Sequence, residues 1–303
     1  MNFKPLTLSD YDAVKFFFTE QPYNLCIYSP ASLIAWSNRI YMNRYLITGG
    51  TLFVAGEAQD RPQDRHLILP LSNDRIYSPE ELHRLARKLG FAQYWYAPGD
   101  YLDSLDHSEL EAHFIMEEQS GFADYVYLAE DLAGLKGNRF SKKRNLIHQF
   151  FREYIRKNRV VIEAIHEINA PECQQFLEIW CEEYACEVDQ ESNLACEKEA
   201  LITMLQNMDH LESVGILIRI DGAVCALGIG SRLNGTMATF NFEKAFSRFK
   251  GLYQYLDNEC AKRLFKGYRY INKESDMNLP NLAEAKQSYH PVSRIKSFAL
   301  ILR

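Results

Sequence analysis

The stretch that decides the fold is ILIRIDGAVCALGIGSRLNGTMATFNF, residues 216–242. Two dipeptides in it, Asp221-Gly222 and Asn234-Gly235, are of the kind that tight β-hairpin turns require. They predict a three-stranded antiparallel meander made of Ile216–Ile220, Ala223–Leu233 and Thr236–Phe242. Because the glycines at 228 and 230 fall inside a strand, we do not expect a dinucleotide-binding fingerprint, which needs a strand-to-helix turn.

Helices and strands are expected to alternate on both sides of the meander, because apolar spacing switches between the helical and the extended period. The elements expected after it are a helix, a strand, a helix and a strand at Gly251–Phe265, Tyr268–Asn272, Leu282–Tyr289 and Arg294–Leu302. The elements expected before it are a strand and two helices at Val160–Ile168, Pro171–Cys186 and Glu197–Met208.

The first half of the chain gives a fainter version of the same order of elements. Its expected helices are Ser9–Glu20, Ser78–Leu89 and His107–Glu118, and its expected strands are Tyr45–Ala55, His66–Leu71, Phe91–Tyr96 and Ala123–Leu128. We therefore predict a duplicated α+β fold of mixed, mostly antiparallel sheets flanked by helices. The expected parts are a degenerate N-terminal domain (1–135), a basic linking helix (136–159) and a C-terminal domain (160–303) that carries the active cleft.

Composition limits the class of protein. The chain has 303 residues, 47% of them hydrophobic and 24% charged, and a net charge of −6, which argues against a surface devoted to nucleic acid. It has no apolar run of the roughly 18 to 20 residues that span a bilayer, and no signal peptide, so we expect a cytoplasmic protein. Seven cysteines without a CxxC pair suggest buried, reduced thiols, with no metal and no tightly bound cofactor.

Polar residues gather where the expected strands end after the meander, which is where ligands bind in open α/β sheets. Glu243 and Lys244 end the third meander strand, and Asn272, Glu274 and Asp276 follow the next strand. Carboxylates that lie close together raise each other's pKa, which suits Glu243 or Glu274 to the role of general base. The alternatives are a solvated ion pair at a strand end and ordinary turn residues.

The helix after the second of these strands offers three more candidates, Lys286, Tyr289 and His290. Lys286 and Tyr289 are three residues apart and share one helix face, where the lysine could stabilise an oxyanion. His290 precedes Pro291 and could equally be the end of the helix.

A second candidate site is the turn Arg248-Phe-Lys-Gly-Leu-Tyr253, where a strand gives way to a helix. Gly251 would let backbone N–H groups face an anion, with Arg248 nearby and Tyr253 in the first turn. The alternative is a surface turn in which the glycine only satisfies the backbone geometry. The sequence leaves both open.

The linking segment 134–159 holds nine Lys or Arg and one acid, with an apolar stripe at helical spacing. Its basic residues, Arg139, Lys142, Lys143 and Arg144 among them, could hold tRNA phosphates or anionic lipid headgroups. The alternative is a solvated face.

These motifs resemble known families. The meander, turn and helix resemble the GNAT-like acyltransferase fold. FEK (242–244), KGLYQ (250–254), INKESD (271–276) and AKQSYHP (285–291) resemble the C-terminal domain of phosphatidylglycerol lysyltransferases, and RFSKKRNLIHQF (139–150) is similar to the basic stretch before it. The resemblance covers about 135–303.

The resemblance implies tandem GNAT-like domains and transfer of an acyl or aminoacyl group from acyl-CoA or aminoacyl-tRNA. It also implies that Tyr289 gives a proton to the leaving group. The membrane region of the full-length synthases has no counterpart in these residues, so we expect a small-molecule or peptide amine or hydroxyl as acceptor. The alternatives are an acetyl-CoA-dependent N-acetyltransferase and a non-catalytic small-ligand-binding module.

Overall fold

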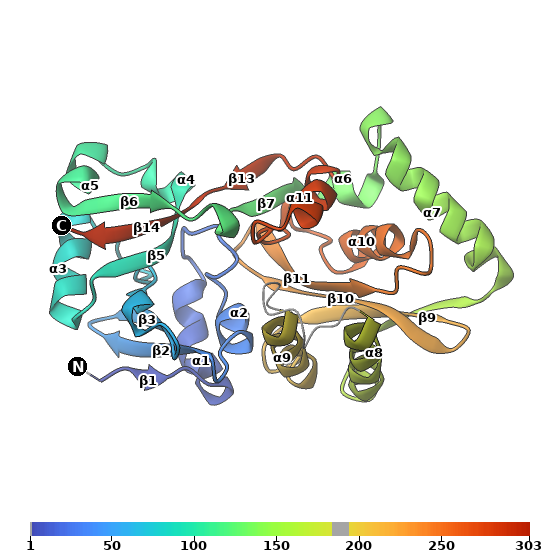
Figure 1. The fold of residues 1–303 in the computed structure, drawn as a ribbon, viewed down its shortest axis with the longest axis horizontal. Coiled ribbons are helices and arrows are strands. Elements are labelled where there is room, and N and C mark those ends of the chain that lie inside the picture. The colour runs from blue at the N-terminus through green and yellow to red at the C-terminus, as the bar shows by residue number, and fades with distance from the viewer. Residues whose placement is uncertain (1, 184–193) are drawn as a thin grey trace.

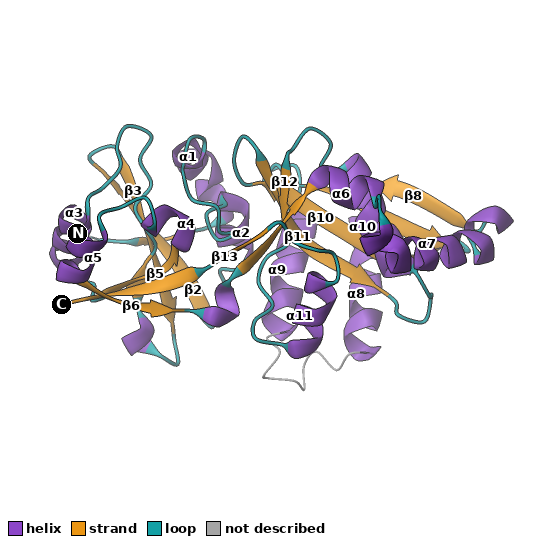
Figure 2. Cartoon of the chain, turned by 90° about the horizontal axis from the view of Figure 1, so that it is seen from above, coloured by secondary structure: helices purple, strands orange, loops and turns teal. Residues whose placement is uncertain are grey.

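The computed structural model describes residues 2–183 and 194–303, with only the backbone of 194–196. Two seven-stranded sheets lie side by side, each with helices packed against it (Figures 1 and 2). The strand order is β1-β2-β3-β4-β5-β14-β6 in the first sheet and β13-β7-β12-β11-β10-β9-β8 in the second. The predicted α+β class is therefore confirmed.

The first sheet and its helices come mainly from the first half of the chain. Its strands are β1 (Lys4–Pro5), β2 (Tyr41–Thr48), β3 (Thr51–Ala58), β4 (His66–Leu67), β5 (Gln93–Pro98), β6 (Phe114–Glu118) and β14 (Ser297–Leu302). The helices are α1 (Tyr11–Val14), α2 (Pro30–Ala35), α3 (Pro79–Leu89), α4 (Gly99–Leu102) and α5 (His107–His113).

The second sheet contains the predicted meander. Its strands are β7 (Asp124–Leu128), β8 (Val160–Ala164), β9 (Val214–Ile220), β10 (Ala223–Arg232), β11 (Met237–Ala245), β12 (Tyr270–Asn272) and β13 (Ser293–Ile295). The helices are α6 (Ala129–Gly134), α7 (Ser141–Glu153), α8 (Ala170–Glu183), α9 (Leu194–Gln206), α10 (Leu252–Arg263) and α11 (Pro280–Gln287). Helices α8 and α9 cover one face, and α10 and α11 the other (Figure 1).

The two hairpin turns of the meander form by different means. Asp221 and Gly222 both have positive φ, +53° and +85°, as the predicted tight turn requires. Asn234 instead uses its side chain, whose Oδ1 accepts hydrogen bonds of 3.0 Å from the backbone N–H groups of Thr236 and Met237.

The two halves exchange strands. β7 comes from the first half but pairs with β12 and β13 in the second sheet. β14 comes from the end of the chain but lies between β5 and β6 in the first sheet. The domain boundaries at 135 and 160 stay a prediction, and each sheet depends on both halves.

Several sequence expectations were wrong in detail, and the strand expected at His66–Leu71 is reduced to β4 at His66–Leu67. The expected strand Tyr45–Ala55 is a hairpin, because Gly49 and Gly50 turn the chain with positive φ. The expected helix His107–Glu118 ends at His113 and continues as β6, and the helix expected at Ser9–Glu20 is broken into α1 and two short 3-10 helices, Leu8–Asp10 and Lys15–Phe18. Arg294–Leu302 is split between β13 and β14, which belong to different sheets. The expected end of the helix at Cys186 lies outside the described residues.

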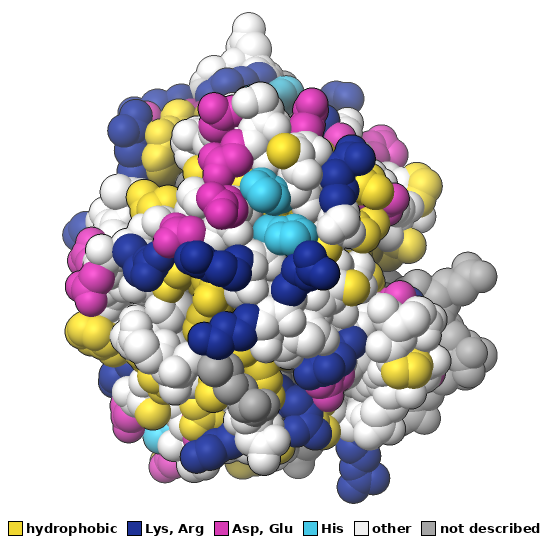
Figure 3. Space-filling model, turned by 90° about the vertical axis from the view of Figure 1, so that its left-hand side faces the viewer, with side chains coloured by type: hydrophobic (Ala, Val, Ile, Leu, Met, Phe, Trp, Pro, Cys, Tyr) yellow, Lys and Arg dark blue, Asp and Glu magenta, His cyan; other side chains and the backbone are white. Residues whose placement is uncertain are grey.

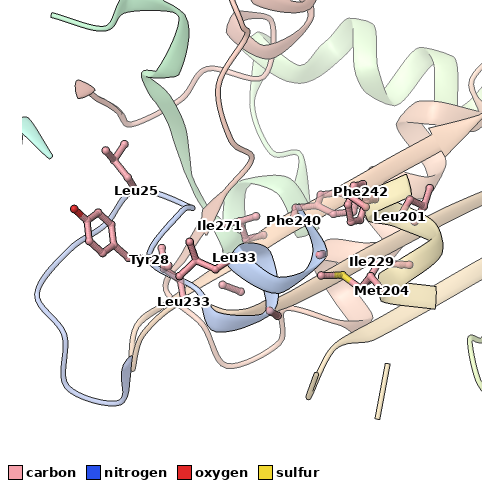
Figure 4. Close-up of a cluster of buried hydrophobic side chains, with 14 of the residues drawn as sticks. Leu25, Tyr28, Leu33, Leu201, Met204, Ile229, Leu233, Phe240, Phe242 and Ile271 are labelled. Carbon is pink, nitrogen blue, oxygen red and sulfur yellow. The ribbon is translucent and has the colours of Figure 1, made fainter. Parts of the chain in front are cut away.

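A short helix from the first half helps to bury the second sheet. Leu33 of α2 lies among Leu233, Ile271 and Phe240 in a shared hydrophobic cluster (Figure 4). Trp36, just after α2, stacks on Phe242 of β11 with ring centroids 6.2 Å apart. One apolar core therefore runs beneath both sheets, so the segment 21–36 is fixed against the ends of β11 and β12.

Within the described residues, no helix is long and apolar enough to cross a membrane. Cys173, Cys181, Cys225 and Cys260 are buried free thiols, and Cys26 is partly buried. The remaining two cysteines lie where side chains are not described. The described side chains include no group of three or more His, Cys, Asp or Glu that could hold a metal ion.

Candidate active site where two parallel strands part

The site is built where β11 and β12 separate. The two strands pair in parallel over only three positions, from Met237 opposite Tyr270 to Thr239 opposite Asn272. β11 then continues to Ala245, whereas the chain leaves β12 after Asn272. A β-bulge at Asn241, which has no partner on β10, turns the side chains beyond it. The strand ends thus leave room for side chains between them.

A lysine and two carboxylates fill this space on the side of α10. Lys273 Nζ lies 2.9 Å from Glu243 Oε2 and 2.8 Å from Asp257 Oδ2. Asp257 is 1% exposed, and its second oxygen has no hydrogen-bond partner among the described residues. We call Glu243, Asp257, Lys273 and the nearby Tyr289 and Lys143 the lysine–carboxylate cluster.

The environment of this cluster raises the pKa of two of its members, Glu243 and Tyr289. Burial raises the pKa of Glu243 to about 6, a rise to which Asp257 adds and which Lys273 opposes. Burial, together with the charges of Asp257 and Glu243, raises the pKa of Tyr289 well above its ordinary value. At neutral pH Glu243 is therefore mostly an ionised base, and Tyr289 keeps its proton.

Lys143 reaches this cluster from α7, although the sequence placed it on a basic surface. Its Nζ lies 3.7 Å from the centre of the Tyr289 ring and donates a hydrogen bond of 2.6 Å to Ser288 Oγ. Burial lowers the pKa of Lys143 to about 8. Lys273 Nζ lies 5.1 Å from the same ring, so Tyr289 has two ammonium groups close to it.

Glu274 lies in a second polar group that joins the two halves. Asn241 Nδ2 is 3.5 Å from Glu274 Oε1 and 3.1 Å from Ser32 Oγ of α2. Burial raises the pKa of Glu274 to about 8; Lys286 opposes the rise and Asp124 adds to it. Glu274 is therefore mostly protonated at neutral pH.

Asn272 holds the backbone of this second polar group in place. Its side-chain amide donates to Asp124 Oδ2 (2.8 Å) and to the carbonyl of Asn24 (2.9 Å), and its Oδ1 accepts from Glu274 N (2.7 Å). Asp124 is 1% exposed and also accepts from Cys26 N at 2.7 Å. Asn272 thus acts through the backbone that positions Glu274.

Lys286 lies between the two groups and holds the chain that leaves β12. Its Nζ donates to the carbonyl oxygens of Lys273 (2.5 Å), Glu274 (3.2 Å) and Ser275 (2.6 Å). Glu274 has φ of +59°, which costs energy for a residue with a side chain. The ammonium group therefore stabilises a strained turn, and burial lowers its pKa.

Other predicted site residues lie elsewhere. Lys244 points to the opposite face of the sheet, where its Nζ is 2.7 Å from Glu197 Oε2 and 4.2 Å from the Trp180 ring. Arg248 is half exposed, pairs with Glu183 and lies over Phe246 at 3.7 Å. Neither is in contact with the lysine–carboxylate cluster.

The residues around the loop after β12 have structural partners. Asp276 accepts hydrogen bonds from Tyr125 Oη (2.5 Å) and Arg294 (3.1 Å). His290 is exposed, and its Nε2 lies 3.2 Å from the carbonyl oxygen of Arg139.

Tyr253 lies outside this loop and is partly buried in the first turn of α10.

The turn at Gly251 faces another helix. Gly251 has φ of +88°, and a Cβ added to it would lie 2.2 Å from the carbonyl oxygen of Leu146 in α7. The glycine thus allows α7 to pack directly against the start of α10. Of the two interpretations of this turn, the packing geometry favours the structural one.

Two residues of the predicted basic surface form contacts within the chain. Arg139 pairs with Asp131 at 2.6 Å, and Arg144 donates to the carbonyl oxygens of Leu135 and Gly137 beyond α6. Lys142 is exposed.

Asp257 and Lys273 were missed as site residues from sequence. Asp257 sits next to Leu256 in the helix that follows the meander, and an acid beside an apolar stripe was the available signal. Lys273 lies within INKESD, between two residues that were singled out.

The fold and this site define an α+β protein of two mixed sheets with its polar cluster in the second sheet. The chain belongs to the family of phosphatidylglycerol lysyltransferase C-terminal domains, whose model matches residues 80–301. No curated protein matches the sequence.

Two similar solved structures have the same fold, and a third is a more distant match. A conserved protein of unknown function from Bacteroides thetaiotaomicron VPI-5482 is 26% identical with a TM-score of 0.88, covering 100% of both chains. The C-terminal domain (DUF2156) of a protein assigned as a lysylphosphatidylglycerol synthetase from Agrobacterium fabrum is 13% identical, with a TM-score of 0.65 over 96% of this chain and 91% of that one. A tandem GNAT protein from the clavulanic acid biosynthesis pathway has a TM-score of 0.48 and 10% identity, over 98% and 97%.

Proposed function

We propose that the protein is an acyltransferase or aminoacyltransferase that uses the lysine–carboxylate cluster as its active site. The observation that carries the proposal is the group formed by the partly buried Glu243 and Lys273 and the buried Asp257 beside Tyr289, at the point where two parallel strands part. This group places a base that is ionised at neutral pH, Glu243, near an acid that is protonated at neutral pH, Tyr289.

The reaction follows from these protonation states. The amine or hydroxyl of the acceptor attacks the carbonyl carbon of the donor ester or thioester and gives its proton to Glu243. The bond from that carbon to the donor oxygen or sulfur then breaks, and the leaving atom takes the proton of Tyr289. Lys143 and Lys273 supply positive charge beside the phenol as it loses its proton.

In this proposal Glu274 and Lys286 do not take part in proton transfer. Lys286 holds the turn that carries Lys273 and Glu274, so it positions the cluster through the backbone. The predicted oxyanion role of Lys286 stays a prediction.

Aminoacyl-tRNA is the donor that we favour over acyl-CoA. An anion at the start of α10 would meet the Leu146 carbonyl oxygen next to Gly251, which disfavours a phosphate there. The exposed Lys142, Arg152 and Arg156 of the α7 region offer phosphate contacts on the outside of the molecule. Aminoacyl-tRNA is made in the cytoplasm, so the proposal includes a cytoplasmic location, with a small-molecule or peptide acceptor.

The test offers the protein both donors. Total tRNA charged with labelled amino acids is incubated with the protein and a protein-free extract, and loss of label from tRNA is compared with the spontaneous rate. We expect accelerated loss that Glu243→Gln and Tyr289→Phe abolish. Saturable acetyl-CoA binding without tRNA deacylation would support the N-acetyltransferase, and the absence of turnover with both donors would support a binding module.

A further inference from the structure

A pocket of 220 Å³ opens in the first sheet, away from the site just described. It lies between α3 and the tip of the β2–β3 hairpin, and its bottom is formed by Thr51, Phe53 and Tyr77, which are 3%, 3% and 4% exposed. Leu85 and Leu89 of α3 form one wall. No part of the proposed transfer reaction uses these residues.

The charges around the pocket are mainly positive. Arg75, Arg84 and Lys88 line it together with one carboxylate, that of Glu81. The lining of the pocket therefore carries a net charge of two positive charges, three from Lys and Arg and one negative from Glu81. Figure 3 views the molecule from the end where α3 lies and shows Lys and Arg side chains around exposed hydrophobic atoms.

The one carboxylate is already committed to the fold. Glu81 Oε2 accepts from the backbone N–H of Ser78 at 3.0 Å and completes the capping box of α3, while its other oxygen pairs with Arg75. The hydrogen bond from Ser78 lowers the pKa of Glu81, so the carboxyl stays ionised and holds Arg75 over the Tyr77 ring at 4.4 Å. Arg84 reaches Glu81 only at 4.0 Å. Among the described side chains, Lys88 has no ion-pair partner.

The hydroxyl groups at the bottom of the pocket can donate one hydrogen bond to a ligand. The hydroxyl groups of Thr51 and Tyr77 are hydrogen-bonded to each other, and one such bond uses only one of their two hydrogens. The other hydrogen is left for an oxygen acceptor. A ligand with several anionic oxygens would therefore meet a hydroxyl at the bottom and guanidinium and ammonium groups at the rim.

We infer that this pocket binds the phosphate group of a small soluble molecule. Phosphate offers the tetrahedral set of oxygen acceptors that two arginines, a lysine and a hydroxyl can bind together. The volume suits a phosphate with a few further atoms, which would lie against Leu85 and Leu89. The two glycines of the hairpin tip, Gly49 and Gly50, leave the entrance without bulky side chains.

Calorimetric titration with pyrophosphate and with glycerol 3-phosphate at low ionic strength tests the inference. We expect one saturable site, weakened about tenfold or more in the double variant Arg84→Ala/Lys88→Ala. Arg87→Ala is the matched control, since Arg87 lies on the same helix, is exposed and does not line the pocket; its affinity should stay within about twofold of the wild type. Thermal unfolding of each variant confirms that it is folded.

Three outcomes would overturn the inference. They are no saturable binding of either probe, an equal loss of affinity in Arg87→Ala, and binding only to vesicles that contain phosphatidic acid. The last would make the anion a lipid headgroup. None of these outcomes depends on transferase activity, because the titrations contain no acyl or aminoacyl donor and measure binding alone.

Discussion

Lys273 bridges the gap between two parting strands by donating a 2.9 Å hydrogen bond to Glu243, which lies on the strand that continues. The same ammonium group contacts Asp257 of α10 at 2.8 Å. Three elements of the second half are therefore held together by one charge, at the proposed active site.

Replacing Glu243 should remove the proposed base. We expect Glu243→Gln to lower the rate of donor consumption by about 100-fold or more, since general bases contribute on this scale. In the wild type, activity should rise as the pH passes about 6, because Glu243 must lose its proton to act. Glu163→Gln, whose carboxylate pairs with Arg219 in the edge region of the same sheet, is the control. An unchanged rate in Glu243→Gln would remove this residue from the mechanism.

Lys286 should be needed for stability. In Lys286→Met, three backbone carbonyl oxygens lose their buried donor, and we expect a loss of about 3 kcal/mol in the free energy of unfolding. Urea denaturation measures it. Lys296→Met, which removes an exposed pair with Glu118, should cost less than about 1 kcal/mol. Similar losses in both variants would show that the carbonyl contacts are not the cause.

Glu274 should make stability depend on pH. Its folded-state pKa of about 8 lies above that of a carboxyl in an unfolded chain, so the folded state binds the extra proton. This contribution is complete at acid pH and is lost as the pH rises through about 8. Between pH 6 and pH 8 the wild type should lose on the order of 1 to 2 kcal/mol more than Glu274→Gln, in which the group is always neutral. Parallel pH profiles for the two proteins would contradict the assignment.

Gly251 should tolerate no side chain. Gly251→Ala places a Cβ against the Leu146 carbonyl in a left-handed backbone conformation, and we expect a loss of about 3 kcal/mol. Gly222 is the matched control, since its φ is +85° and a Cβ there would meet nothing within 4 Å. Gly222→Ala should cost only the conformational penalty, about 1 to 2 kcal/mol. Equal losses by urea denaturation would mean that α7 can move aside.

The sequence was informative where local chemistry decides structure. The Asp221-Gly222 turn, the capped start of α3 and the strand that carries Glu243 all follow from neighbouring residues. The positions of Lys143 and Asp257 depend on how α7 and α10 pack on the sheet, and Lys244 points away because the strand alternates its faces. Contacts between distant segments, such as Asn241 with Ser32, leave no local pattern to detect.

The position of β14 has a consequence for synthesis of the protein. The strand that lies between β5 and β6 is Ser297–Leu302, and in the sequence every strand of the second sheet is made after β6 and before it. During translation, β5 and β6 therefore leave the ribosome before their common neighbour has been made, so the first sheet cannot take its final strand order until Ser297–Leu302 is available. Until then β5 and β6 each keep an unpaired edge, and unpaired strand edges favour aggregation.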